Sequence, residues 1–177
     1  MAVRLAHTCR KVIAVDKDPV KIVMVRQRAA ELEVAHRIEF RVGDSFEALS
    51  KVKADAVITS PPWAALAWYP NRRFSTEDLC SRQKGGLAGV LKIAGEIAPL
   101  VVPHVPKTIH MSQTVEVSRE QGFGHVEIEH VSVEEWKNSS NAVLYIQRSC
   151  EGGELVEPTV SEVVLDPKSV LPQRSYA

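Results

Sequence analysis

The chain has 177 residues, 45% of them hydrophobic and 25% charged, which suits one globular domain with a sizeable core. Basic and acidic residues number 22 each, so the zero net charge excludes a bulk field that would gather nucleic acid or membrane nonspecifically. Three dispersed cysteines indicate neither a disulfide framework nor a zinc site. We expect a soluble intracellular protein with no secretion signal, membrane span or metal, and the oligomeric state stays open.

The first half of the chain alternates between strand and helix patterns. "KVIAVD" at 11–16 predicts a strand, and Asp18 with Pro19 predicts the cap and first position of a helix over 19–32. Strands at 37–42 and 55–60 follow, with the helix-like "SFEALSKV" between them. This order predicts an α/β fold with a mostly parallel sheet and helices on both faces.

The second half is less regular. A short helix or turn is expected at 77–81 and a helix at 86–97, while "PLVVPHV" and "KTIHM" are ambiguous short strands. Segments 125–133 and 141–148 alternate like a pair of strands. From Glu151 the pattern fades, so we predict a folded domain over 1–150 and an extended or disordered tail over 151–177.

Two carboxylates follow expected strands. Ligands of open α/β sheets bind beyond the carboxyl ends of the strands. Asp16 is therefore a candidate to accept hydrogen bonds from ribose hydroxyls, and Asp44 from an adenine amine. The structural alternative is that Asp16 is a second helix cap beside Asp18 and that Asp44 caps a helix starting near Ser45.

The stretch "TSPPW" begins within the third expected strand and continues beyond its end. Pro61 and Pro62 fix φ at about −65°, so the carbonyl of Pro61 can be held to accept a hydrogen bond from an exocyclic amine. Such positioning steers the nitrogen lone pair toward an activated methyl group. Trp63 can stack on the base that carries the amine; the alternative is a proline turn whose tryptophan fills a gap in the core.

Four segments, "VIAVDKDPVKI", "RIEFRVGDSF", "ADAVITSPPW" and "HVEIEH", together resemble the trimethylguanosine synthase family. These S-adenosylmethionine-dependent methyltransferases act on N2 of the 7-methylguanosine cap of small nuclear and nucleolar RNAs. The resemblance covers about residues 3–147 and implies a Rossmann-like class I methyltransferase sheet. It also implies 7-methylguanosine-capped RNA as partner and residence in the nucleus, with the cytoplasm as a further location.

The resemblance assigns roles to individual residues. Asp16 is expected at the cofactor ribose and Asp44 at its adenine. Ser60, Pro61 and Pro62 are expected beside the transferred methyl group and the target amine, with Ser60 also contacting the cofactor.

Substrate contacts are expected from three further positions. Trp63 would stack on the cationic 7-methylguanine, which attracts an indole face. Arg28 replaces a family asparagine that lies near the cap phosphates, and Arg72 with Arg73 could meet the triphosphate or the RNA backbone. For these arginines a solvated surface role is the alternative.

The chain also departs from the family pattern. The glycine-rich loop after the family's first strand has no counterpart, so we expect an N-terminally incomplete methyltransferase domain without its central strand. That loss would leave two strands without a neighbour and an open edge. The alternatives are a catalytically inactive homologue that acts as a binding module, or an amino-methyltransferase acting on another nucleic acid.

Overall fold

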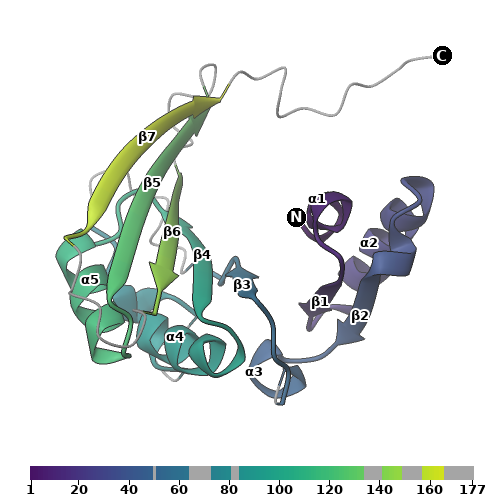
Figure 1. Ribbon diagram of the computed structural model, residues 1–177, viewed down its shortest axis with the longest axis horizontal. Helices are drawn as coiled ribbons and strands as arrows, with labels where there is room; N and C mark the ends of the chain where they lie inside the picture. The colour runs from purple at the N-terminus through teal and green to yellow at the C-terminus, as the bar shows by residue number, and fades with distance from the viewer. Residues whose placement is uncertain (50, 64–72, 81–83, 134–140, 149–156, 166–177) are drawn as a thin grey trace. The chain divides into compact units, whose positions relative to one another are not determined.

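The computed structural model describes residues 1–49, 51–63, 73–80, 84–133, 141–148 and 157–165 (Figure 1). They belong to two compact units, Met1–Val52 and Lys53–Ala177. This division does not test the predicted boundary at residue 150, which stays a prediction.

The first unit contains two parallel strands and the helices around them. Its elements are α1 (Ala2–Thr8), β1 (Val12–Asp16), α2 (Pro19–Glu31), η1 (Ala35–Arg37), β2 (Ile38–Val42) and α3 (Ser45–Ala48). β1 pairs with β2 in parallel, with Asp16 opposite Val42. A small core of Ala6, Ala29, Val34 and Ile38 joins α1, α2 and β2. The predicted strand–helix–strand order of this segment is confirmed.

Helix α2 begins where the sequence predicts. The Asp18 carboxylate accepts a 2.9 Å hydrogen bond from the Val20 amide, and Pro19 occupies the first turn, where its missing N–H costs nothing. Ile22 and Ala29 are buried, whereas Leu32 lies beyond the helix and is 38% exposed. The helix therefore buries one face at Ile22 and Ala29 and ends one residue before the predicted limit.

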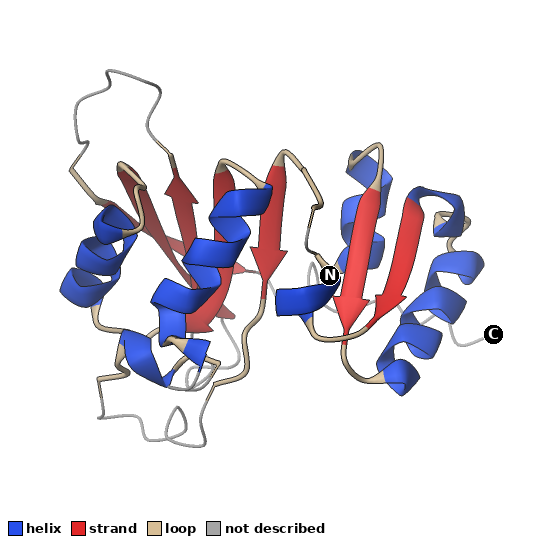
Figure 2. Ribbon diagram, turned by 90° about the horizontal axis from the view of Figure 1, so that it is seen from below, coloured by secondary structure: helices blue, strands red, loops and turns tan. Residues whose placement is uncertain are grey.

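The second unit is a sheet with helices packed against it (Figure 2). Its elements are β3 (Ala56–Thr59), η3 (Thr76–Asp78), α4 (Gly86–Ile97), β4 (Leu100–Pro106), α5 (Met111–Glu120), β5 (His125–Val133), β6 (Asn141–Gln147) and β7 (Thr159–Leu165). The strand order is β3-β4-β6-β5-β7, with β3 parallel to β4 and β5 antiparallel to β6. Leu87 and Leu91 of α4 share one core with Val101, Ile128 and Leu144 of the strands.

The sequence does not predict α5. "KTIHM" forms no strand; Ile109 makes an isolated bridge with Phe74, and the helix begins at Met111. Its fully buried residues are Thr114 and Ser118, whose hydroxyls donate to the carbonyls of His110 and Thr114 at 3.0 and 2.7 Å. Back-bonding to the preceding turn lets these polar residues occupy the buried face, so the fully buried positions of α5 carry hydroxyls instead of large apolar side chains.

Part of the expected tail is a strand of the sheet. β7 pairs in parallel with β5, from Thr159 opposite Glu127 to Leu165 opposite Val133. The residues of β7 are extended, which is one of the two alternatives expected for the tail. They form part of the sheet and are not disordered. Residues 151–156 and 166–177 of the expected tail lie outside the described residues.

Four of the described strands have one neighbour each. β1 and β2 bond only to each other, β3 bonds only to β4, and β7 bonds only to β5. Parallel strands are usually buried on both faces, yet all five residues of β1 are only half-buried and those of β3 alternate between exposed and half-buried. The expected loss of a central strand stays a prediction.

The start of α4 gives a stability prediction. Gly86 has φ of 58°, and a Cβ added there would lie 2.5 Å from the Thr76 carbonyl oxygen and 2.6 Å from the Cα of Glu77. Gly122 also has a positive φ, of 81°, but its Cβ would meet nothing within 4 Å. We expect Gly86→Ala to lower the free energy of unfolding by about 3 kcal/mol, since it adds overlap to backbone strain.

Gly122→Ala is the matched control and should cost only about 1 kcal/mol. Urea unfolding followed by circular dichroism measures both values. Equal losses in the two variants would contradict the close contact between α4 and η3.

Candidate active site

Two carboxylates lie at one edge of the first unit's sheet. β1 and β2 run in parallel and end together, and the Gly43 amide donates a 3.1 Å hydrogen bond to the Asp16 carbonyl. Asp44 follows directly after Gly43. The structure therefore brings the Asp16 and Asp44 segments to the same edge, as the parallel order predicts.

Both side chains also stabilise the local backbone. Oδ1 of Asp16 accepts a 2.9 Å hydrogen bond from the Asp18 amide, and Oδ2 lies 3.8 Å from the Lys21 ammonium. Oδ1 of Asp44 accepts a 3.0 Å bond from the Phe46 amide and caps α3. The capping alternative is thus confirmed for Asp44, while Asp16 bonds the residue that itself caps α2.

These local bonds are compatible with ligand binding. An ionised carboxylate offers about four acceptor positions, and the Asp16 side chain is 36% exposed. Ribose hydroxyls and an exocyclic adenine amine are hydrogen-bond donors, so the chemistry of the two carboxylates fits a nucleoside-containing cofactor. The assigned roles at ribose and adenine remain predictions.

The Ser-Pro-Pro-Trp loop of the second unit follows β3 directly. Ser60 is exposed, Pro61 is buried, and the Pro62 carbonyl accepts a 3.1 Å hydrogen bond from the Cys80 amide. Trp63 forms an isolated antiparallel bridge with Leu79. The loop is therefore tied to the segment after η3 by main-chain contacts, which fix its path beyond the strand.

Trp63 is half-buried and anchored at its nitrogen. Its Nε1–H donates a 3.2 Å hydrogen bond to the carbonyl of His104, and the two rings lie 5.4 Å apart at 52°. The indole also packs against the core of the second unit. These contacts fix the ring orientation, and they agree with both interpretations that the sequence leaves open for Trp63.

His104 belongs to this site although the sequence does not single it out. Thr59 of β3 pairs with Pro103 of β4, so the next residues, Ser60 and His104, lie side by side. Ser60 Oγ and His104 Nδ1 are 3.5 Å apart, and burial lowers the pKa of His104 below its usual value. A histidine at the end of the ambiguous segment "PLVVPHV" is the only sequence sign, because strand register depends on distant residues.

The predicted substrate arginines have surface positions. Arg28 lies exposed on α2 and forms a 2.8 Å ion pair with Glu31. Arg73 is exposed, and Arg72 lies outside the described residues. Their assignment to phosphates therefore stays a prediction.

Two further features concern metals and membranes. In the part of the chain that the structure describes, no group of three or more His, Cys, Asp or Glu side chains could hold a metal ion. None of the helices there has the length and apolar character needed to cross a membrane.

Comparison with known proteins decides the family. A sequence model of the RNA cap guanine-N2 methyltransferase family matches residues 1–157. The chain belongs to this family. Membership in the RNA cap guanine-N2 methyltransferase family confirms the resemblance seen in the sequence. It also makes the chain a methyltransferase, with S-adenosylmethionine as the cofactor that supplies the methyl group.

Solved structures share the fold of class I methyltransferases. Precorrin 8W decarboxylase from Methanobacterium thermoautotrophicum is 19% identical with a TM-score of 0.53, over 81% of this chain and 73% of that one. Precorrin-6y C5,15-methyltransferase from Geobacter metallireducens is 14% identical with a TM-score of 0.52, over 78% and 68%. The hMettl16 catalytic domain, solved with a MAT2A 3′UTR hairpin, is 14% identical with a TM-score of 0.54, over 84% and 58%.

The lowered pKa of His104 predicts how stability changes with pH. Burial disfavours the imidazolium, so below the ordinary value of 6.5 the unfolded chain binds more protons than the folded chain. Wild-type stability should therefore fall as the pH drops below 6.5. A His104→Phe variant should lose less stability over the same pH range.

Urea unfolding at several pH values compares the two proteins. The exposed His36 supplies the control, since His36→Phe should leave the wild-type pH dependence unchanged. Parallel pH curves for the wild type and His104→Phe would contradict the stated effect of burial.

Proposed function

We propose that this chain transfers methyl groups from S-adenosylmethionine to N2 of the 7-methylguanosine cap of RNA and so forms a hypermethylated cap. The family match over residues 1–157 supports the reaction class. The observation that carries the specific reaction is the Ser-Pro-Pro-Trp loop, whose tryptophan is fixed by the hydrogen bond from Nε1 to the His104 carbonyl.

Trp63 is the proposed contact with the base. A 7-methylguanine ring is cationic, and a cation over an indole face gains about 0.5–2 kcal/mol, depending on desolvation. The anchored N–H fixes the ring orientation, so less side-chain entropy is lost when the base stacks. A methylated cap is therefore preferred over an unmethylated guanine.

The loop before Trp63 is the proposed place of methyl transfer. The buried Pro61 and the exposed Pro62 have fixed φ angles, and the Pro62 carbonyl is already bonded to the Cys80 amide. We assign the Pro61 carbonyl to the target amine and Ser60 to the region of the transferred methyl group. Holding the amine in line with the methyl group lowers the barrier by positioning.

The cofactor contacts are proposed at the edge where β1 and β2 end. We assign Asp16 to the ribose hydroxyls and Asp44 to the adenine amine, and Arg28 to the cap phosphates. The resemblance supports small nuclear and nucleolar RNAs as the substrates and the nucleus as the location.

Cofactor binding tests the first part of this proposal. We expect micromolar binding of S-adenosylhomocysteine by isothermal titration calorimetry, weakened at least about tenfold in Asp16→Ala, because two hydrogen bonds to a charged group are lost. Asp16→Asn is the matched control, since an amide oxygen can still accept the 2.9 Å bond from the Asp18 amide. It should preserve α2 and bind with intermediate affinity.

A folded chain that binds no S-adenosylhomocysteine would contradict the enzymatic proposal. It would favour the alternative of an inactive homologue that acts as a binding module.

Cap selectivity tests the second part. We expect methyl transfer to RNA with a 7-methylguanosine cap and much less to RNA with an unmethylated guanosine cap. Trp63→Ala should raise KM for the methylated cap about 2- to 30-fold, the range of the cation–π energy, and Trp63→Phe should raise it less.

Methyl incorporation with tritiated cofactor gives these values, and circular dichroism checks that the variants fold. Equal transfer to both caps would instead support an amino-methyltransferase that acts on another nucleic acid.

A further inference from the structure

His104 lies between the two functional residues of the loop. Its Nδ1 is 3.5 Å from Ser60 Oγ, its carbonyl accepts the Trp63 Nε1–H, and its ring lies 5.4 Å from the indole. We propose that His104 is a positioning residue that takes up, through the Ser60 hydroxyl, the proton released by the target amine. This inference rests on the proposed function, since it assigns a role within the same site.

The parallel register of β3 and β4 creates this arrangement. Thr59 lies opposite Pro103, so the two strands deliver Ser60 and His104 to the same edge. Ser60 is exposed whereas His104 is half-buried behind it. The hydroxyl is thus the group that a bound amine can reach, and the imidazole is the group that can receive a proton from the hydroxyl. Bonds of this kind are often long before substrate binds.

The proton transfer balances the methyl transfer. The N–C bond to the target amine forms as the S–C bond of the cofactor breaks, and the bonding electron pair of that bond remains on sulfur. The nitrogen then carries one hydrogen too many. Ser60 Oγ accepts this hydrogen as a proton and passes its own to His104 Nδ1. The imidazolium finally releases the proton to water.

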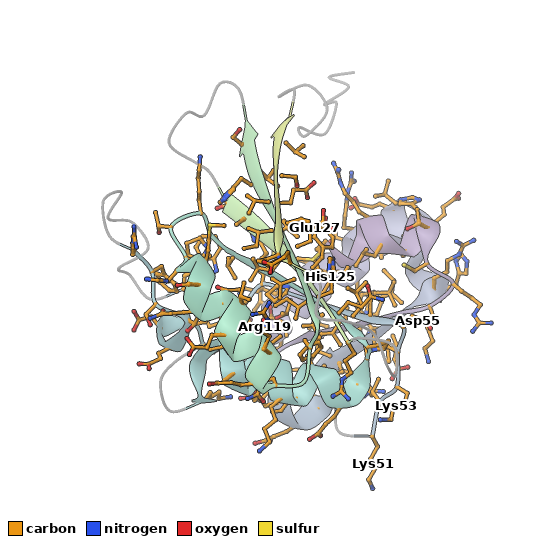
Figure 3. The ribbon with its side chains drawn as sticks, turned by 60° about the vertical axis from the view of Figure 1, so that its left-hand side comes forward. Lys51, Lys53, Asp55, Arg119, His125 and Glu127 are labelled. Carbon is orange, nitrogen blue, oxygen red and sulfur yellow. The ribbon has the colours of Figure 1, made fainter. Side chains whose placement is uncertain are left out.

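The surroundings of His104 favour the neutral base before each transfer. Burial is the cause that lowers the pKa of His104, so the imidazole is neutral at neutral pH. Ser60 faces it from the loop after β3, and Val143 lies opposite it on β6. The titratable groups on this face of β5 and β6 are His125, Glu127, Glu129 and Tyr145. His125 and Glu127 project from β5 in Figure 3, and Tyr145 donates a 3.0 Å bond to Glu129.

Two variants of His104 separate proton uptake from hydrogen-bond acceptance and from packing of the ring. His104→Asn keeps an acceptor atom near the position of Nδ1 but cannot take a proton. His104→Phe keeps an aromatic ring against Trp63 but loses both the acceptor atom and the ability to take up a proton. Neither variant removes the main-chain carbonyl of residue 104 that accepts the indole N–H. His36→Asn is the matched control, because His36 is exposed in the first unit.

Steady-state methyl transfer to capped RNA is measured across pH for each protein. We expect kcat to fall at least about tenfold in both His104 variants, with KM for capped RNA changed less than twofold. The acidic limb of the wild-type kcat profile should disappear in His104→Asn. If kcat of His104→Asn equals that of the wild type, the proposal that His104 takes up a proton is overturned. If kcat of His104→Phe equals that of the wild type, His104 contributes only its packing against Trp63, and the proposal is likewise overturned.

Tryptophan fluorescence supplies a measurement that needs no activity. An imidazolium next to an indole quenches its emission, so wild-type fluorescence should drop as the pH falls through the His104 pKa. The transition should be absent in His104→Asn and in Trp63→Phe. Ser60→Ala should shift its midpoint upward, because the hydroxyl bond favours neutral imidazole. An unshifted midpoint would overturn the link between Ser60 and His104.

The two proposals fail in different ways. A wild-type chain that methylates no capped RNA overturns the proposed function. A wild-type chain that methylates capped RNA, with His104→Asn equally active at every pH, overturns the inference about His104 alone.

Discussion

Parallel strand pairing is the constraint on which the rest of the structure depends. Because parallel strands end at the same edge, residues far apart in the chain meet there. In the first unit this pairing brings the Asp16 and Asp44 segments together, and in the second it places Ser60 beside His104. A shift of one residue between β3 and β4 would turn the His104 side chain to the other face. The core formed by Val101, Leu144 and α4 therefore fixes the site as well as the fold.

The candidate site is held mainly by bonds that involve the main chain. The Cys80 amide and the Pro62 carbonyl fix the loop through main-chain atoms alone. The His104 carbonyl accepts its hydrogen bond from the Trp63 indole, a side chain that is itself proposed to act on substrate. In the first unit, Asp16 and Asp44 each accept a hydrogen bond from a backbone amide with one carboxylate oxygen. These structural bonds leave room for the proposed ligand-binding roles, because a carboxylate has more acceptor positions than a cap requires.

The features that the sequence predicts well are those with local causes. Asp18 and Pro19 begin α2 through their own backbone chemistry, and the alternating residues of β5 and β6 indicate paired strands. The features that it misses have distant or unusual causes. α5 buries Thr114 and Ser118 instead of large apolar residues, and β7 pairs with β5, a strand that is distant in the chain. His104 enters the site through a register that no local pattern specifies.

β7 also affects where a shortened form of this protein can end. The family match ends at residue 157, just before Thr159, where β7 begins. A protein cut at the family boundary would keep the residues proposed to act on the cap, yet it would uncover β5 as an edge strand of nine residues. Unpaired edges recruit other chains. With β7 present, the edge strand at this side of the sheet has seven residues instead of nine, and expression of a shortened form should extend through Leu165 so that β5 keeps its neighbour.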